Sequence, residues 1–407
     1  MDIQKIRDCF PTLRTDEPPA YLDNACVTLK PDSVIQTIND YYHHTPGCGG
    51  RGVHRYSTKV SRATNDARRK LQTFLNAESA NEVVFTRNAT HSLNQVAHGL
   101  SWQKGDVVLT TDREHNSNLV PWLQLEQEQG IEHRVVPSLE DNTFDMEGFE
   151  QACKDAGSRL KLVSMSQVGN LDGVKIPIRD IAKVAHDHGA YVCVDGAQST
   201  PHMRVDVQDL GIDFLAFSIH KMCGPSGMGG LWGRYELLDE LRTIQSGGQT
   251  VTASTYDSLQ WANPPARFEG GLGNFSGMMA TGTAIEFLSQ FNMDEVQAHE
   301  IKLNEIMSNG IKDLPGVKII GPHDAKLRSG ICSVVLKELP AHDIAMLLDE
   351  AAGVMVRSGQ HCVHSWFNAR GHKDGSLRAS AYMYNTEDEA RLFAETLSEA
   401  VHAFSAA

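Results

Sequence analysis

The sequence predicts an α/β protein with a large, doubly wound, mostly parallel sheet and a smaller α+β domain behind it. Between residues 60 and 235, apolar runs with strand character alternate with helical patterns, which is typical of helices wrapped around a parallel sheet. From about Thr281 a long helical stretch and short strands replace that alternation. At 407 residues the chain is long enough for two domains.

About seven strands are expected in the larger domain, because that many apolar runs lie between turn signals. They are Glu82–Thr86, Asp106–Thr111, Glu132–Pro137, Leu160–Val168, Ala190–Val194, Phe214–Ser218 and Gly229–Trp232. Two helical stripes support the alternation. One lies within Arg62–Asn76, and the other is formed by Ile178, Ile181, Ala182 and Ala185.

In the smaller domain we expect one helical stretch, two strands and two further helices. In chain order these are Ala284–Leu314, Val317–Ile320, Gly330–Leu336, Ala341–Ala352 and a closing helix from Glu387. The segment Gln249–Arg267, rich in Thr, Ser and Pro, is predicted to be a long connection with a function of its own.

Composition excludes several function classes. The net charge of −14 argues against a nucleic-acid partner, which needs a basic face. No apolar run approaches the roughly 20 residues of a membrane span, and Met1–Lys5 lacks the features of a signal peptide. The eight cysteines are scattered without a Cys-x-x-Cys pair, so neither a metal site nor a disulfide framework is expected. Reduced thiols and a cytoplasmic location fit this pattern best.

Two strand ends predict the chemistry. The run Phe214–Phe217 leads into Ser218-Ile219-His220-Lys221, which places an amine and anion-binding donors together at the end of a buried strand. The run before it ends in Asp195. An acid and a lysine at neighbouring strand ends are what pyridoxal 5'-phosphate (PLP) requires. Taken singly, a solvated lysine and a turn aspartate are the alternatives.

Seven segments, in order, resemble the class V aminotransferase family of PLP enzymes, and within it the cysteine desulfurases. They are Ala20–Ala25, Arg51–Ser57, Glu114–Trp122, Val194–Gln198, Arg267–Gly271, Arg357–Cys362 and Leu377–Ser380. The resemblance runs nearly end to end. It implies PLP-dependent transferase fold type I and three parts: residues 1–20 packing with the small domain, a large domain over 21–280 and a small domain over 281–407.

The resemblance also assigns residues to the cofactor. Asp195 holds the pyridinium proton, Lys221 bonds to the cofactor, His115 stacks on the ring and assists proton transfer, and Gln198 donates to the phenolic oxygen. The phosphate is assigned to Ala89, Thr90, Ser218 and His220. Members commonly have two threonines where this chain has Ala89-Thr90. Thr90 and backbone amides are therefore expected to supply more of the hydrogen bonds to the phosphate.

For the substrate, the resemblance assigns Arg378 to the carboxylate and Asn170 as its amide partner. Cys362 decides the reaction, because a desulfurase needs a thiolate that takes sulfur from cysteine. Its surroundings, Arg357 to His361, are polar and charged, which favours a thiolate over a buried structural cysteine. They resemble the Arg-x-Gly-x-His-Cys motif of the second, Suf-associated group.

The predicted function is therefore a cytoplasmic, homodimeric L-cysteine desulfurase that places a persulfide on Cys362 for an acceptor or iron–sulfur scaffold protein. Two departures bear on partners. Leu272 replaces a threonine that reaches across the dimer in relatives, and Val363–Asn368 differs from the usual apolar stretch. The alternatives are a selenocysteine lyase acting on L-selenocysteine, and an aminotransferase or epimerase with an incidental Cys362. A non-enzymatic sulfur carrier would lack Lys221 or Asp195.

Overall fold

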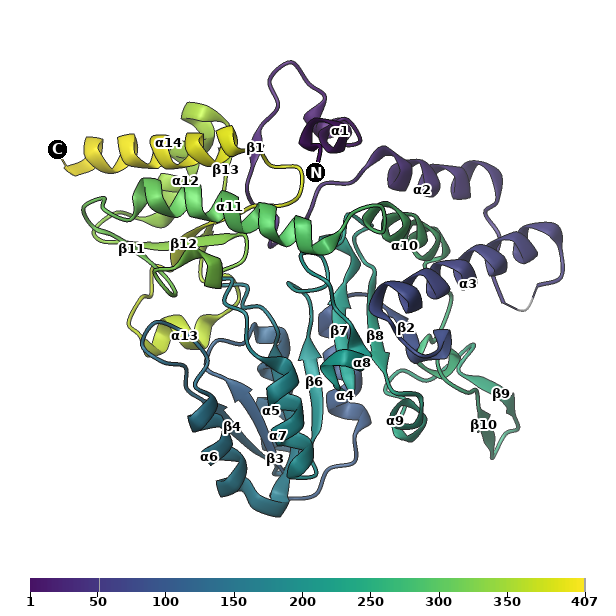
Figure 1. Ribbon diagram of the computed structural model, residues 1–407. Coiled ribbons are helices and arrows are strands. Elements are labelled where there is room, and N and C mark those ends of the chain that lie inside the picture. Colours follow the sequence, from purple (N-terminus) through teal and green to yellow (C-terminus); the bar gives the residue numbers. More distant parts are fainter. Residues whose placement is uncertain (51, 406–407) are drawn as a thin grey trace.

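A computed structural model describes residues 1–50 and 52–405. Its main feature is a seven-stranded sheet with the order β2-β8-β7-β6-β5-β3-β4 (Figure 1). Only β8 runs antiparallel to its neighbours; the other strands share one direction. The strands are β2 (Val83–Thr86), β3 (Val107–Thr111), β4 (Glu132–Val136), β5 (Leu160–Ser166), β6 (Tyr191–Asp195), β7 (Phe214–Ser218) and β8 (Gly229–Gly233). All seven predicted strands are confirmed, with ends that differ by at most two residues.

Helices cover both faces of this sheet, as the alternation predicts. Successive strand residues point to opposite faces, so Val192 and Val194 of β6 join one apolar cluster and Cys193 joins another. The first cluster includes residues of α3 (Arg55–Leu75), α6 (Met146–Ala156), α7 (Ile178–Asp187) and α10 (Phe275–Leu288). The second includes α4 (Ala89–Gly99), α5 (Val120–Gln129) and α9 (Tyr235–Glu240). The sheet is therefore buried on both sides.

The smaller unit is a four-stranded antiparallel sheet with the order β11-β12-β15-β14, covered by helices (Figure 1). Its strands are β11 (Val317–Ile319), β12 (Ile331–Leu336), β14 (Arg357–Gly359) and β15 (Ser376–Ser380). Its helices are α11 (Met293–Ile311), α12 (Ala341–Ala352), α13 (His364–Ala369) and α14 (Glu387–Ser405). The helix predicted over Ala341–Ala352 begins and ends at those residues in the structure, as α12. The strands β14 and β15 were not predicted.

The helical stretch predicted over Ala284–Leu314 is wrong as one helix. α10 ends at Leu288 and α11 begins at Met293. Asn292 ends the interruption, because its side chain caps α11 by accepting from the Asp294 N–H at 3.0 Å. No glycine or proline marks this break, so the pattern alone reads as continuous.

The remaining elements connect the two units. The N-terminal segment forms α1 (Ile3–Arg7) and β1 (Ala20–Tyr21), and β1 pairs in parallel with β13 (Val354–Met355) of the small unit. Phe10 packs in the large cluster, whereas Leu22 packs in that of the small unit. α2 (Asp32–His44) packs on α10, and the short α8 (Val207–Leu210) follows β6. The domain limits at residues 20 and 280 stay a prediction.

The segment Gln249–Arg267 contains an antiparallel hairpin, β9 (Val251–Ser254) and β10 (Leu259–Trp261). In Figure 1 it projects away from the body of the molecule. Most of its side chains are exposed, and Tyr256 at its tip is fully exposed. Three large apolar side chains of the hairpin, those of Tyr256, Leu259 and Trp261, are exposed.

Candidate active site

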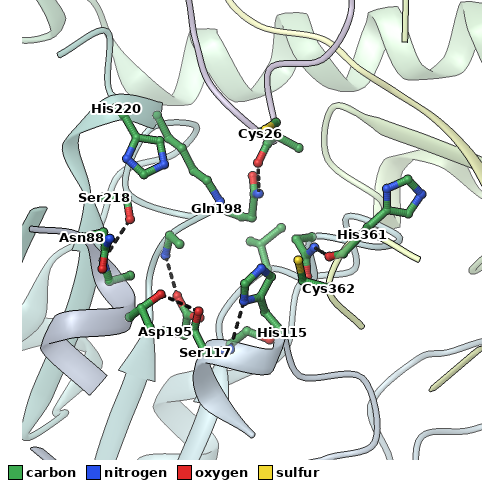
Figure 2. A pocket seen from close by; sticks show the side chains of 18 of the residues that line it. Cys26, Asn88, His115, Ser117, Asp195, Gln198, Ser218, His220, His361 and Cys362 are labelled. Carbon is green, nitrogen blue, oxygen red and sulfur yellow. Dashed lines mark hydrogen bonds between the residues drawn. The ribbon is translucent and has the colours of Figure 1, made fainter. Parts of the chain in front are cut away.

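All the site residues assigned from the sequence line one cavity of about 210 Å³. They come from the C-terminal ends of the large sheet's strands and from two segments of the small unit. The residues are Ala89, Thr90, His115, Asn170, Asp195, Gln198, Ser218, His220, Lys221, Cys362 and Arg378. Figure 2 shows strand-end side chains on one side of the cavity and the Cys362 loop on another.

Asp195 and Lys221 lie on neighbouring strand ends, because β6 and β7 pair in parallel with Asp195 opposite Ala216. The Asp195 carboxylate accepts from the Ala197 N–H at 2.9 Å and is only 5% exposed. Burial raises its pKa. Burying the charged carboxylate costs free energy, and a cation beside it would offset that cost. A pyridinium nitrogen is such a cation.

Lys221 ends a short 3-10 turn after β7. Burial lowers the pKa of its amine, and the Asp195 carboxylate opposes this only in part. A lowered pKa leaves more of the amine neutral and nucleophilic at neutral pH. Lys221 is therefore suited to covalent bonding with an aldehyde.

An anion cradle lies beside this lysine, at the start of α4. Helix starts leave backbone N–H groups unpaired. The Ala89 N–H donates to Ser218 Oγ at 2.9 Å, and Thr90 Oγ1 lies 2.6 Å from Ser117 Oγ. Burial lowers the pKa of His220 to about 4, so its ring is neutral. These donors suit a phosphate.

His115 is held by a buried neighbour. Glu114 is 1% exposed and accepts from the Thr111 hydroxyl and the Asn118 amide, which anchors the loop after β3. His115 Nδ1 accepts from the Ser117 N–H at 3.1 Å. Burial, with Lys221 nearby, lowers the pKa of His115 to about 3. The ring is therefore neutral with its proton on Nε2, which suits stacking on a cationic ring and moving one proton.

Arg378 is buried but not fully paired. Its Nη1 donates to the Asn170 carbonyl at 2.9 Å and its Nη2 contacts Asp23 Oδ1 at 3.3 Å. Its buried Nε has no partner among the described residues. Arg378 lines the cavity, and a buried guanidinium in such a place is suited to a carboxylate.

The Cys362 loop leaves β14 in an uncommon conformation. His361 and Cys362 both have positive φ, 47° and 58°, a region that non-glycine residues seldom adopt. Two bonds hold the loop at the cavity: Asn116 N–H donates to the Cys362 carbonyl at 2.7 Å, and Asn170 Nδ2 to the His361 carbonyl at 2.8 Å. The Cys362 side chain is exposed. The Asn170 side chain therefore donates a hydrogen bond to the loop.

Sequence reasoning missed several residues that line the cavity, notably Cys26, Ser117 and Ser166. Ser117 lies inside the family-like segment Glu114–Trp122, so its place near the site could have been inferred from the sequence. Cys26 directly follows another motif, but its approach to Arg357 depends on the pairing of β1 with β13. Arg51, part of a quoted motif, lies outside the described residues.

The donor set fits PLP. The cavity offers a buried carboxylate, a lysine of lowered pKa, a neutral histidine and an anion cradle. Gln198 Nε2 donates one hydrogen to the Ala25 carbonyl at 2.8 Å, which leaves the second for a ligand. Its buried Oε1 has no partner among the described residues.

Within the described residues, no group of three or more His, Cys, Asp or Glu side chains could hold a metal ion. No helix in that part of the chain is long and apolar enough to cross a membrane.

Comparisons with known proteins agree with this geometry. A protein from Halalkalibacterium halodurans named probable cysteine desulfurase is 36% identical over 98% of this chain and 98% of its own length. The apo structure of cysteine desulfurase from Thermococcus onnurineus NA1 has a TM-score of 0.93 at 32% identity, covering 98% of both chains. The cysteine desulfurase CsdA from Escherichia coli has a TM-score of 0.90 at 28% identity over 99% of both. The Aminotransferase class-V family matches residues 20–393. The chain belongs to the class-V aminotransferase family.

Proposed function

We propose that this chain is a PLP-dependent cysteine desulfurase that converts L-cysteine to L-alanine and retains the sulfur as a persulfide on Cys362. One observation supports this above all others. An exposed cysteine on a tethered loop lines the same cavity as a lysine of lowered pKa and a carboxylate-binding arginine. Full-length relatives named cysteine desulfurase support the same activity.

The sheet side of the cavity would hold the cofactor. Lys221 would bond to it, Asp195 would face the ring nitrogen, His115 would stack on the ring, and the α4 start would take the phosphate. When bound, PLP supplies an electron sink that weakens bonds at the substrate's α and β carbons. The chain's own part is to orient the substrate and to take the sulfur.

Arg378 would hold the substrate carboxylate. Arg378 lines the cavity, and its Nη2 already contacts one carboxylate, that of Asp23. A fixed carboxylate directs the rest of the substrate toward Lys221 and Cys362. Proton transfer at the substrate carbon requires a base with a free lone pair. The neutral His115 ring supplies one, and the lowered pKa of Lys221 leaves more of its amine unprotonated.

Cys362 would then take the sulfur. Its thiolate attacks the substrate's sulfur, an S–S bond forms, and the C–S bond breaks with its electron pair left on carbon. Protonation of that carbon gives alanine. Because the Cys362 side chain is exposed, the outer sulfur of its persulfide is open to an acceptor protein. We propose a cytoplasmic sulfur-acceptor or iron–sulfur scaffold protein as that partner; the Suf-type assignment stays a prediction.

Product analysis tests the reaction. The purified protein with PLP should form alanine from L-cysteine, and a reductant should release the retained sulfur as sulfide. Formation of a keto acid in place of alanine would favour an aminotransferase. A parallel assay with L-selenocysteine, comparing kcat/KM for the two substrates, separates the desulfurase from a selenocysteine lyase.

We also propose a homodimer. Large apolar side chains are exposed on α2, on the segment before α3, on the β9–β10 hairpin and on the loop before α10; they are Tyr42, Val53, Tyr256, Leu259, Trp261 and Leu272. Exposed apolar groups of this kind mark protein interfaces. Leu272, 78% exposed, cannot donate a hydrogen bond, so it would contribute apolar contact to a partner. Sedimentation at assay concentration should show a dimer, and a fully active monomer would contradict this.

A further inference from the structure

A second thiol lies in the cavity and has no role in the reaction described above. Cys26 follows the end of β1, and of the eight cysteines only Cys26 and Cys362 line the cavity. Figure 2 shows both side chains at the same cavity, contributed by opposite ends of the chain. Cys26 is partly exposed.

An arginine contacts the sulfur of Cys26. Arg357 Nη1 donates to Cys26 Sγ at 3.5 Å, and the same nitrogen lies 3.5 Å from Asp23 Oδ2. The pKa of Arg357 is raised, first by attraction to the Cys26 sulfur, with Asp23 and Cys362 adding to it. The Arg357 guanidinium therefore contacts the Cys26 sulfur and interacts electrostatically with Cys362.

Lys221 also interacts electrostatically with both cysteines. Cys26 and Cys362 each oppose the lowering of the Lys221 pKa. Two further residues, each 3% exposed, line the cavity, and each has a buried atom without a partner among the described residues: Nε of Arg378 and Oε1 of Gln198. Gln198 also bonds to the carbonyl of Ala25, directly before Cys26. Cys26 therefore lies beside residues that are assigned above to the cofactor and the substrate.

We propose that Cys26 is a second sulfur acceptor, which takes the outer sulfur from the Cys362 persulfide within one protomer. This inference rests on the proposed desulfurase function. The Cys26 thiolate attacks the outer sulfur, a new S–S bond forms, and the S–S bond of Cys362 breaks. The electron pair goes to Cys362, which becomes a thiolate again, and no oxidant or reductant is consumed.

Both cysteines line the same cavity, and a persulfide lengthens the Cys362 side chain by about 2 Å, the length of an S–S bond. The returned Cys362 thiolate can act on a second substrate before any acceptor arrives. Each protomer would then store two sulfurs instead of one.

The test is to map sulfur on the enzyme with PLP bound, given excess L-cysteine without acceptor or reductant. Persulfides are alkylated at short times and located by peptide mass spectrometry. We expect sulfur on Cys362 first and on Cys26 later, with an alanine burst per protomer twice that of Cys26→Ala. Cys26→Ser repeats the comparison, and Cys48→Ala, which removes an exposed cysteine outside the cavity, should give the wild-type burst.

Each other outcome has one meaning. A loaded Cys362 with a sulfur-free Cys26 and equal bursts overturns the inference and leaves the desulfurase function intact. Sulfur on Cys26 in Cys362→Ala overturns the order of transfer, and a Cys26–Cys362 disulfide with released sulfide overturns transfer of the outer sulfur. If no cysteine is loaded and no alanine forms, the proposed function itself fails. If both Cys26 variants lose their fold, the wild-type sulfur map alone decides.

Discussion

The two sides of the cavity differ in how they are built. The sheet side presents Asp195 and Ser218, which are 5% and 3% exposed, from the ends of buried strands. The loop side presents Arg357, whose side chain is 52% exposed, and an exposed Cys362 in a left-handed backbone conformation. Buried, fixed groups are suited to holding a cofactor and shifting pKa values. Exposed groups on a loop are suited to passing sulfur to a partner.

The largest effect should come from the sheet side, at Lys221. Lys221→Ala should remove the visible absorption of the lysine-bound cofactor and lower turnover by about a thousandfold or more. Borohydride should fix the cofactor on Lys221 in the wild type. Lys30 is the internal competitor, because burial lowers its pKa to about 8 and its Nζ lies 2.8 Å from the His220 carbonyl. Trapping on Lys30 would refute the assignment.

Two arginines of the small unit, one buried and one exposed, sharpen the comparison between buried and exposed groups. Arg378→Lys should reduce kcat/KM by about ten- to a hundredfold, mainly through KM, because a buried planar guanidinium is replaced by a single point of charge. Arg357→Lys is the matched substitution at an exposed position and should have a smaller effect on KM. Steady-state kinetics at equal cofactor occupancy measures both. Equal effects would place the substrate carboxylate between the two residues.

A smaller effect concerns stability and pH on the sheet side. His115 has a folded pKa of about 3 against an ordinary value near 6.5. Between these values the unfolded state binds the proton, so stability is present above about pH 6.5 and is lost as pH falls. From pH 7 to 5 the loss due to His115 should be about 2 kcal/mol.

Denaturant unfolding of the cofactor-free protein measures this loss. His115→Gln should show a flatter fall in the free energy of unfolding than the wild type. His43→Gln, which replaces an exposed histidine of α2, is the matched control. An identical slope in His115→Gln and wild type would show that burial of His115 does not shift its titration.

The same contrast explains what could be predicted from the sequence. Strand ends are local: an apolar run followed by Lys221 or Asp195 reveals both the strand and its chemistry. The approach of Cys26 to Arg357 is not local, because it depends on β1 pairing with a strand more than 330 residues away. The break before Asn292 was missed because helical patterns continue on both sides. Register and loop conformation decide these features, and neither is visible in residue spacing.

The most direct test of the central claim is alanine formation by Cys362→Ala in a single turnover, with enzyme in excess over L-cysteine. The variant should keep the wild-type cofactor spectrum and bind L-cysteine, because the sheet side is intact. We expect alanine formation to fall by about a hundredfold or more, since the thiolate that takes the sulfur is gone. Cys48→Ala is the control. Alanine formed by Cys362→Ala at a near wild-type rate would contradict the account and favour a lyase that releases sulfur without this thiol.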